Sequence, residues 1–438
     1  MSNRIITPAA ETIELLSTQG TYKNSHEIDV GGLPYSMREM LIAAPLIAGL
    51  NVYLVGATGE GKTQLANDLA GFLGEHYCYT EGRPDFELSE IMKQVNLHKL
   101  KDVTSDRELV ELTENVRKAL FYVDELNRCP PIVQNYFFNF FDGKFVHQGR
   151  ILQLGKDGYA VGYASGNIGN GAYVGTEDSD RALKDRMHMI VKLDDPRYST
   201  EVEDDYAIFT GKKNPRASLP DQGKDLSERI FQLHREFGQR EVPTILPVLG
   251  VLFHKGLDYL QTTTRNSKRA VDNVWPNVPG IRQDTDESKI MPLSKRAILS
   301  SIGLTEALAM IAEAKGQQVP DHVDLFLDAL QFTIPYSGVL SQQYVFNEKG
   351  GDAYEAFDAV MAGIKKEITD RKEALETALA YASFGEREET ALDKISPIGI
   401  STRWSPVRRV LEHLADNQLE EKVRLDQIRA EYKKPAAK

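Results

Sequence analysis

The sequence predicts an α/β fold in which a mostly parallel sheet is sandwiched by helices, followed by a largely helical second half. Short apolar segments at residues 51–55, 119–123, 159–165 and 187–193 are typical of buried parallel strands, because both faces of such strands are covered. Strands that alternate with helical segments favour parallel pairing. Beyond about residue 200 the strand patterns fade, which predicts an all-α lid and a helical C-terminal region.

Helical patterns surround these strands. Residues 36–49 carry an apolar face before the first strand, and residues 62–73 carry apolar residues at helical spacing after it. A helix is expected from about residue 130, since the two prolines there suit a first helical turn. Polar and apolar residues alternate loosely over 143–154, which indicates a hairpin.

The second half contains helices and one long polar segment. Helices are expected to begin near residue 201 and to cover about 225–238, 245–260, 294–314, 321–334, 353–384 and 405–432. Residues 261–292 are turn-rich, which predicts an insertion, a mobile element or a contact surface. The 438 residues exceed the usual size of one core. We therefore expect an N-terminal segment (1–35), an α/β core (36–198), a helical lid (199–335) and a C-terminal region (336–438).

The composition of the chain disfavours some classes of protein and of binding partner. The chain is 41% hydrophobic and 26% charged, which is typical of a folded protein. Its formal charge of −12 makes nucleic acid an unlikely partner, because phosphate backbones are bound by an excess of Lys and Arg. Two cysteines, Cys78 and Cys129, do not make a disulfide framework. Reduced thiols and a cytoplasmic location are the simplest interpretation.

No membrane span is expected. The first residues contain no apolar stretch of the kind found in secretory signals. Residues 40–57 form an apolar run long enough to span a membrane, but Pro45, Gly49 and Asn51 interrupt it. A buried helix followed by a buried strand is the better interpretation.

The strongest motif is a glycine-rich loop between the first strand and the following helix. It fits the pattern GxxxxGKT and comprises Gly56, Ala57, Thr58, Gly59, Glu60, Gly61, Lys62 and Thr63, followed by Gln64. The glycines allow backbone N–H groups to wrap a polyphosphate, as in ATP, and the helix directs its positive dipole end at the anion. Lys62 would place a charge between the β and γ phosphates, and Thr63 would offer a hydroxyl to Mg²⁺.

Two carboxylates, Asp124 and Glu125, follow the second predicted strand. Beside a Mg²⁺-bound triphosphate, Asp124 would hold the metal through water and Glu125 would polarise the attacking water. Alone, the pair could equally be a solvated strand end. Its place downstream of a phosphate loop favours the catalytic interpretation.

Single polar residues are weaker candidates. Asn167 follows the third predicted strand, where its amide could orient the attacking water, although the surrounding sequence also suits a plain turn. Arg181, Arg186 and Arg296 could meet charge on a phosphoryl group, sometimes from a neighbouring subunit. Most arginines are solvated surface groups, so the residues alone assign none of the three.

Together these motifs resemble the AAA+ superfamily, and within it the MoxR-like ATPases, over about residues 30–310. The most specific match is segment 124–134, DELNRCPPIVQ, which is similar to that family's DE-(I/L)-NR-x-PP-x-x-Q block. Segment 164–167, ASGN, stands where the family has an A-T-x-N sensor. Segments 182–187, ALKDRM, and 293–297, LSKRA, are similar to its L-x-DRF and S-P-R-A segments.

The resemblance implies roles and an assembly. Arg186 would be the arginine finger, with Arg181 as the other candidate, and Arg296 would contact the γ-phosphate from the lid. Residues 82–88 look like an insert that faces the central pore or client. The family forms rings, usually hexamers, with ATP and Mg²⁺ at subunit interfaces. It remodels client proteins, often with a von Willebrand factor A-type partner.

Two other functions stay open. The same core serves nucleic-acid motors and loaders, which the acidic composition disfavours. A nucleotide-dependent scaffold would bind ATP and barely hydrolyse it, which an intact Glu125 disfavours. Neither the client nor the role of residues 335–438 follows from the sequence.

Overall fold

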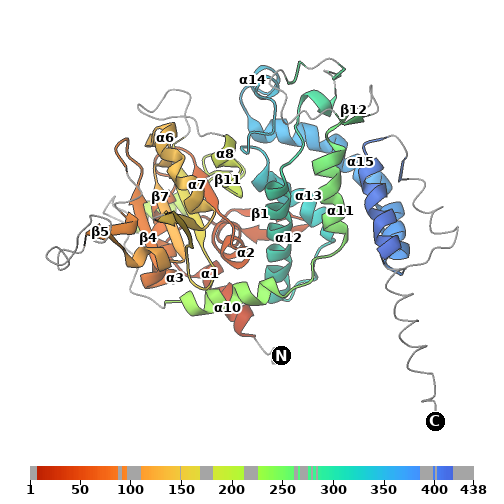
Figure 1. Cartoon of the computed structure of the whole chain (residues 1–438). Coiled ribbons are helices and arrows are strands. Elements are labelled where there is room, and N and C mark those ends of the chain that lie inside the picture. Colours follow the sequence, from red (N-terminus) through yellow and green to blue (C-terminus); the bar gives the residue numbers. More distant parts are fainter. Residues whose placement is uncertain are drawn as a thin grey trace, which may run out of the picture. The chain divides into compact units, whose positions relative to one another are not determined.

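The computed structural model describes residues 7–86, 91–95, 110–147, 149–167, 181–211, 225–260, 265–266, 275–277, 280–282, 285–384, 398–399 and 402–417. The chain divides into two compact units (Figure 1). Unit 1 comprises Met1–Glu241 and Leu299–Ser337, and unit 2 comprises Val242–Ile298 and Gly338–Lys438. These units cut across the four segments expected from the sequence, and that fourfold division stays a prediction.

A five-stranded parallel sheet is the centre of unit 1. Its strand order is β11-β3-β10-β7-β4, and every neighbouring pair is parallel. The strands β3 and β10 are buried along their whole length, as their apolar runs predict. The predicted α/β class, with a parallel sheet flanked by helices, is confirmed. The strands are β3 (Val52–Val55), β4 (Tyr77–Glu81), β7 (Leu120–Asp124), β10 (Val161–Gly166) and β11 (Met189–Lys192).

The edge strand β4 is not predicted by the sequence. Its residues read YCYTE, and only Cys78 is buried. An edge strand is covered less than a central one, so it lacks the continuous apolar run that marks the other strands. Its pairing with β7 places Tyr79 opposite Tyr122 and Glu81 opposite Asp124, which brings β4 into the candidate site.

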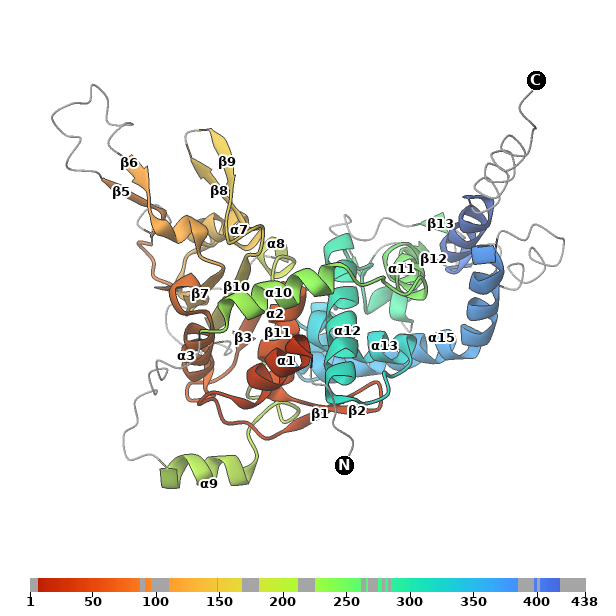
Figure 2. The same cartoon turned by 90° about the horizontal axis from the view of Figure 1, so that it is seen from below.

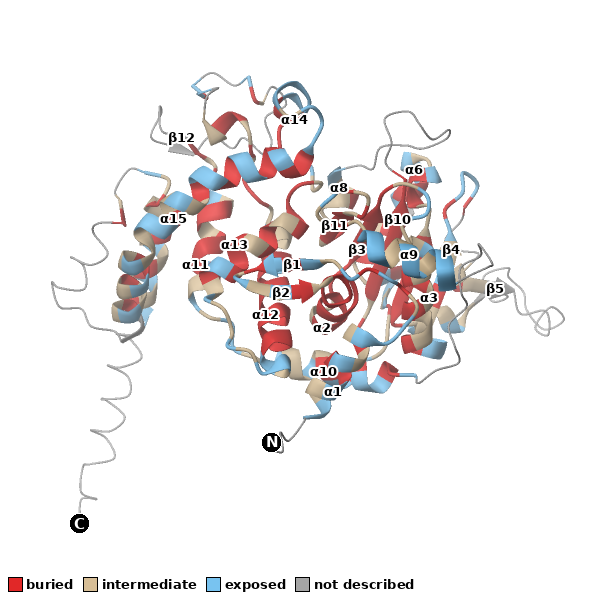
Figure 3. Cartoon of the chain, turned by 180° about the vertical axis from the view of Figure 1, so that it is seen from behind, coloured by how far each residue is buried: buried red, intermediate tan, exposed pale blue. Residues whose placement is uncertain are grey.

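Helices flank this sheet, and Figure 3 shows the buried strands and helix α2 in red. The helix α3 (Lys62–Leu73) packs against β4 and β7, and α7 (Tyr136–Phe141) packs against β10. Between α7 and β7, the ring centroids of Phe140 and Phe121 lie 4.1 Å apart. Other helices of unit 1 are α1 (Pro8–Thr18), α2 (Ala44–Ala48), α6 (Pro131–Gln134), α8 (Arg181–Lys184), α9 (Val202–Gly211), α10 (Ser227–Gly238) and α13 (His322–Thr333).

Among the described residues, three antiparallel strand pairs belong to unit 1. The sequence predicts one of them, β8 (Lys144–His147) with β9 (Arg150–Gln153), and this prediction is confirmed. The pairs β1 (Glu27–Val30) with β2 (Leu33–Ser36), and β5 (Lys93–Val95) with β6 (Val110–Leu112), are not predicted. Figure 2 shows β5–β6 and β8–β9 projecting from the same side of unit 1.

Hydrogen bonds to Asp68 hold the N-terminal segment against α3. The carboxylate of Asp68 accepts hydrogen bonds from the backbone N–H groups of Thr21 (2.7 Å) and Tyr22 (2.9 Å). It also pairs with the Arg38 guanidinium at 2.7 Å, and both side chains are at least 90% buried. The segment before the sheet is therefore part of the folded unit, held at the helix that follows the glycine-rich loop.

We expect Asp68→Ala to destabilise unit 1 by about 3–5 kcal/mol, because it leaves the Arg38 charge buried without its partner. The free energy of unfolding from urea titration measures this. Glu11→Ala is the matched control, since Glu11 pairs with Arg229 at an exposed site. Removing that pair should cost at most about 1 kcal/mol. Equal losses for the two variants would contradict the role of Asp68.

The long apolar run at residues 40–57 is buried, as predicted. A π-helical turn at Glu39–Ala43 continues into α2, and the run then enters β3. Among the described helices, α12 (Lys295–Lys315) alone has the length and apolarity to cross a membrane. However, 72% of its most apolar window is buried inside the protein.

Unit 2 is mostly helical. The helix predicted over 245–260 ends earlier in the structure. The helix α11 (Ile245–Val251) continues as a π-helical turn to Gly256. The last predicted residues instead form the strand β12 (Tyr259–Leu260), which pairs with β13 (Arg265–Asn266). The helix α15 (Ala353–Phe384) matches its prediction, and α14 (Gln342–Glu348) precedes it. Residues 405–417 are helical. Beside them, the buried Trp404 donates a hydrogen bond to Glu367 of α15 at 2.6 Å.

Candidate active site

The glycine-rich loop joins the carboxyl end of β3 to the first turn of α3. Gly56, Gly59 and Gly61 have φ values of +147°, +100° and +77°, which side chains of other residues rarely tolerate. At Gly61 space is also short, because a Cβ atom would lie 3.0 Å from the Tyr22 ring. The glycines of the motif are therefore required by the backbone path, and the loop sits directly above the positive end of α3.

The Lys62 ammonium lies within the loop. Its Nζ donates hydrogen bonds to the carbonyl oxygens of Gly56 (2.8 Å) and Ala57 (2.7 Å), and to Asn167 Oδ1 (3.0 Å). Burial lowers the pKa of Lys62, while the nearby carboxylates of Glu60, Asp124, Asp194 and Glu125 oppose this shift. The structure thus brings the predicted loop lysine and the predicted sensor asparagine into direct contact.

The rest of the loop is open to a ligand. Thr58, Gly59 and Thr63 are exposed, and Glu60 is half-buried. Burial raises the pKa of the Glu60 carboxyl, and the carboxylate of Asp194 adds to this. The Gln64 amide contacts the Thr21 hydroxyl and so links α3 to the N-terminal segment.

Asp124 ends β7 and is held by two hydroxyl groups. Ser165 donates a short hydrogen bond to one carboxylate oxygen, and Tyr79 donates to the other at 2.9 Å. Each oxygen keeps a second lone pair, so Asp124 can also hold a metal ion, directly or through a water. Sequence reasoning misses Tyr79, because the edge strand that carries it has no clear strand pattern.

Glu125 begins the turn after β7 in a left-handed conformation, with φ of +52°. Its backbone N–H donates to the Ser165 hydroxyl at 3.0 Å, and its Oε1 lies 2.8 Å from the Arg128 guanidinium. Burial raises the pKa of Glu125, Arg128 lowers it, and Asp124 raises it. A carboxylate with a raised pKa next to a phosphate loop suits a general base.

Asn167 is held by a residue that sequence reasoning does not assign to the site. The Asn127 amide nitrogen donates to the Asn167 carbonyl at 2.7 Å, and the Asn167 N–H donates to Asn127 Oδ1 at 3.3 Å. Asn127 lies two residues after Glu125, so this pair ties the end of β10 to the turn after β7. Position in the DELNR block is the one sequence signal that points to Asn127.

Arg186 does not join this group within its own chain. The Asn51 amide, just before β3, donates to the Arg186 carbonyl at 2.9 Å. Arg186 therefore lies at the amino end of β3, whereas the glycine-rich loop follows the carboxyl end of that strand. Four residues of strand separate these ends by about 13 Å. The Arg186 guanidinium pairs with Asp142 at 3.2 Å and lies 4.5 Å from the Phe138 ring centroid.

The other two arginines are placed differently. Arg181 is exposed at the start of α8 in unit 1. Arg296 lies in the first turn of α12 and belongs to unit 2, so its sensor role stays a prediction. The structure therefore assembles Lys62, Asp124, Glu125 and Asn167, and leaves Arg186 outside this group.

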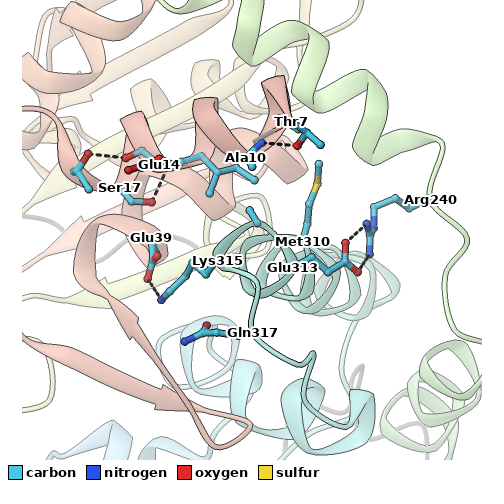
Figure 4. Close-up of a pocket in the computed structure, with 14 residues that line it drawn as sticks. Thr7, Ala10, Glu14, Ser17, Glu39, Arg240, Met310, Glu313, Lys315 and Gln317 are labelled. Carbon is cyan, nitrogen blue, oxygen red and sulfur yellow. Dashed lines mark hydrogen bonds and ion pairs between the residues drawn. The ribbon is translucent and has the colours of Figure 1, made fainter. Parts of the chain in front are cut away.

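A cavity of unit 1 is separate from the loop. It measures about 850 Å³ and lies between α1 and the carboxyl end of α12, with none of the loop residues in its lining. Figure 4 shows two ion pairs at its edge, Lys315 with Glu39 and Arg240 with Glu313, at 3.2 Å and 2.8 Å. Its cations are thus already neutralised by carboxylates, so it does not resemble a polyphosphate site.

Comparison with known proteins agrees with this site. Residues 51–187 match the model of the AAA domain of the dynein-related subfamily, and this region contains the loop, Asp124, Glu125, Asn167 and Arg186. A solved structure from Cytophaga hutchinsonii, described as a "putative ATPase", has a similar fold: 14% identity and a TM-score of 0.54 over 81% of this chain and 92% of that chain. No curated protein matches the chain. These findings support a nucleotide-binding ATPase of the AAA+ class and do not separate the MoxR-like branch from others.

Proposed function

We propose, from the premise that the chain carries an AAA+ ATPase domain, that it is a MoxR-type motor that hydrolyses ATP and remodels a partner protein. The observation that carries this is the hydrogen bond between Lys62 and Asn167. It joins the phosphate loop to the end of β10, where Ser165 holds both Asp124 and the backbone of Glu125. Loop, carboxylates and sensor therefore form one connected network, as coupled binding and hydrolysis require.

The residues of the network have distinct roles in this proposal. Lys62 and the N–H groups of the loop would bind the phosphates of ATP, and Thr63 and Asp124 would hold Mg²⁺. Mg²⁺, when bound, neutralises charge on the phosphates. Glu125 accepts a proton from the attacking water, and Asn167 orients that water. Because Asn167 also contacts Lys62, the presence of the terminal phosphate changes the surroundings of both side chains.

We infer assembly into a hexameric ring, and the position of the arginines supports this proposal. Arg186 lies at the far end of β3 from its own loop, so it can serve a phosphate only in a neighbouring subunit. Arg181, exposed on α8, is the alternative donor. A client protein, a von Willebrand factor A-type partner and a cytoplasmic location complete the proposal.

Affinity purification of the Glu125→Gln variant in ATP tests the proposal. A variant that binds ATP without hydrolysing it should retain its client and sediment as a closed oligomer. The parent chain in ADP is the control and should release the client. ATPase activity that rises with DNA or RNA and not with any captured protein would contradict the protein-remodelling role.

We expect Arg128→Ala to move the acid limb of the ATPase pH profile to higher pH. Glu125 must be ionised to accept a proton, so activity is lost as the pH falls through its raised pKa. Removing the cation 2.8 Å away raises this pKa further, so the loss begins at a higher pH. The profile of kcat against pH measures the shift, with Arg150→Ala on the exposed strand β9 as the control. An unchanged acid limb would count against Glu125 as the base.

A further inference from the structure

The helix α9 carries an apolar stripe that no described residue covers. Val202, Tyr206 and Phe209 are 78%, 70% and 76% exposed, and none of the residues of α9 is buried. At about 100° per residue, these three side chains lie within about 60° of one another around the helix. Contiguous exposed apolar side chains of this size mark an interaction surface rather than ordinary surface composition.

The stripe faces outward because the opposite side of α9 is fixed. Asp204 accepts hydrogen bonds from the backbone N–H and hydroxyl of Ser25, at 2.7 Å and 2.9 Å. Just before the helix, Glu201 pairs with His26 at 2.6 Å. Asp204 lies about 160° around the helix from Tyr206, so the anchored face and the stripe point in nearly opposite directions. The exposure is therefore built into the attachment of the helix.

This anchor connects α9 to the phosphate loop. The Tyr22 ring packs on Gly61 of the loop, and its hydroxyl accepts a hydrogen bond from Asn24 at 3.3 Å. Asn24 also donates to the Tyr198 carbonyl at 2.8 Å, and the next residue is Ser25, which binds Asp204. The helix that carries the stripe is therefore joined to the loop through Asn24 and Tyr22.

The charge around the stripe indicates what covers it. Residues 201–211 contain four carboxylates and no Lys or Arg, so the surface repels polyanions such as nucleic acid. The helix α8 carries the opposite charge, with Arg181 and Lys184. It packs beside α7, which adjoins α6, where Ile132 is 68% exposed. Figure 2 shows α8 and α9 well apart, so α9 cannot meet the α8 of its own chain.

We propose that the stripe of Val202, Tyr206 and Phe209 docks on a second copy of this chain, at the face formed by α6 and α8. This inference rests on the proposed ring, in which the neighbour's Arg181 or Arg186 must approach the loop. The stripe and the face formed by α6 and α8 are the surfaces that would hold the neighbouring subunit in this position. The apolar stripe meets Ile132, and the carboxylates of α9 meet the cations of α8.

Sedimentation velocity with a non-hydrolysable ATP analogue tests the surface. The double variant Tyr206→Ser/Phe209→Ser should need at least about tenfold more protein to assemble, a change of about 1.4 kcal/mol in association. Its affinity for a fluorescent ATP analogue, measured as a monomer, should stay within about twofold, because neither residue contacts the loop. Phe346→Ser is the control, since Phe346 is 59% exposed on α14 of unit 2.

Cysteine cross-linking tests the partner face. Both native cysteines are buried, so introduced cysteines react selectively. A Phe209→Cys chain mixed with a tagged Lys184→Cys chain should give a nucleotide-dependent cross-linked dimer. Mixing with an Ile151→Cys chain, altered on the exposed hairpin strand β9, should give none.

Each outcome bears on the inference in a distinct way. If the parent assembles and the double variant assembles equally well, the docking surface is wrong and the proposed ring is unaffected. A link to Ile151→Cys instead of Lys184→Cys overturns the choice of face. A parent that stays monomeric with the nucleotide bound overturns both the surface and the ring.

Discussion

Glu125→Gln should lower kcat for ATP hydrolysis by about 100- to 10,000-fold, the usual contribution of a positioned general base. The substitution keeps the size of the side chain and removes its ability to take a proton from water. Nucleotide affinity should change little, because Glu125 lies on the turn after β7 and not on the loop. Steady-state phosphate release measures kcat, and a fluorescent nucleotide measures binding.

A neighbouring carboxylate provides the control for this variant. Glu81 ends β4 directly opposite Asp124 and is exposed. Glu81→Gln removes a carboxylate from the same edge of the sheet, so it reports the general electrostatic effect alone. Its kcat should stay within about twofold of the parent. Turnover by Glu125→Gln at the parental rate would show that another group activates the water.

Lys62→Ala should weaken ATP binding by about 10- to 100-fold, which corresponds to the loss of charged hydrogen bonds worth about 1.5–3 kcal/mol. Lys62 is the one cation whose hydrogen bonds lie among the carbonyl groups of the loop in the described structure. Isothermal titration with ATP and Mg²⁺ measures the change.

Two measurements separate this effect from damage to the fold. Lys144→Ala removes an exposed lysine from β8 and should bind ATP like the parent. The melting temperature of Lys62→Ala should not fall much below that of the parent, since burial lowers the pKa of Lys62 and the folded state therefore disfavours its charge. If a folded Lys62→Ala variant bound ATP with unaltered affinity, the assignment of the loop as the ATP-binding site would be wrong.

The fold was predictable where local pattern and burial coincide. Central strands such as β3 and β10 are apolar throughout because both faces are covered, and the loop glycines are recognisable because the backbone path needs them. The edge strand β4 and the strand pairs β1–β2 and β5–β6 were not predicted, because these short strands have no continuous apolar run.

The chemical groups of the candidate site were predictable from the sequence alone. Lys62, Asp124, Glu125 and Asn167 each follow a recognisable strand or open a recognisable helix, so local order along the chain suffices to find them. A fold in which parallel strands end at one edge of a sheet then brings such residues together.

The tertiary structure decided which residues support those groups and which surface lies beside them. Tyr79 and Asn127 reach Asp124 and Asn167 through strand pairing and a turn, across 45 and 40 residues of sequence. Arg186 is separated from its own loop by the length of β3, and the stripe on α9 faces outward because Ser25 holds the other side. These relations depend on strand order and on contacts between distant segments, which periodicity and motif spacing do not encode.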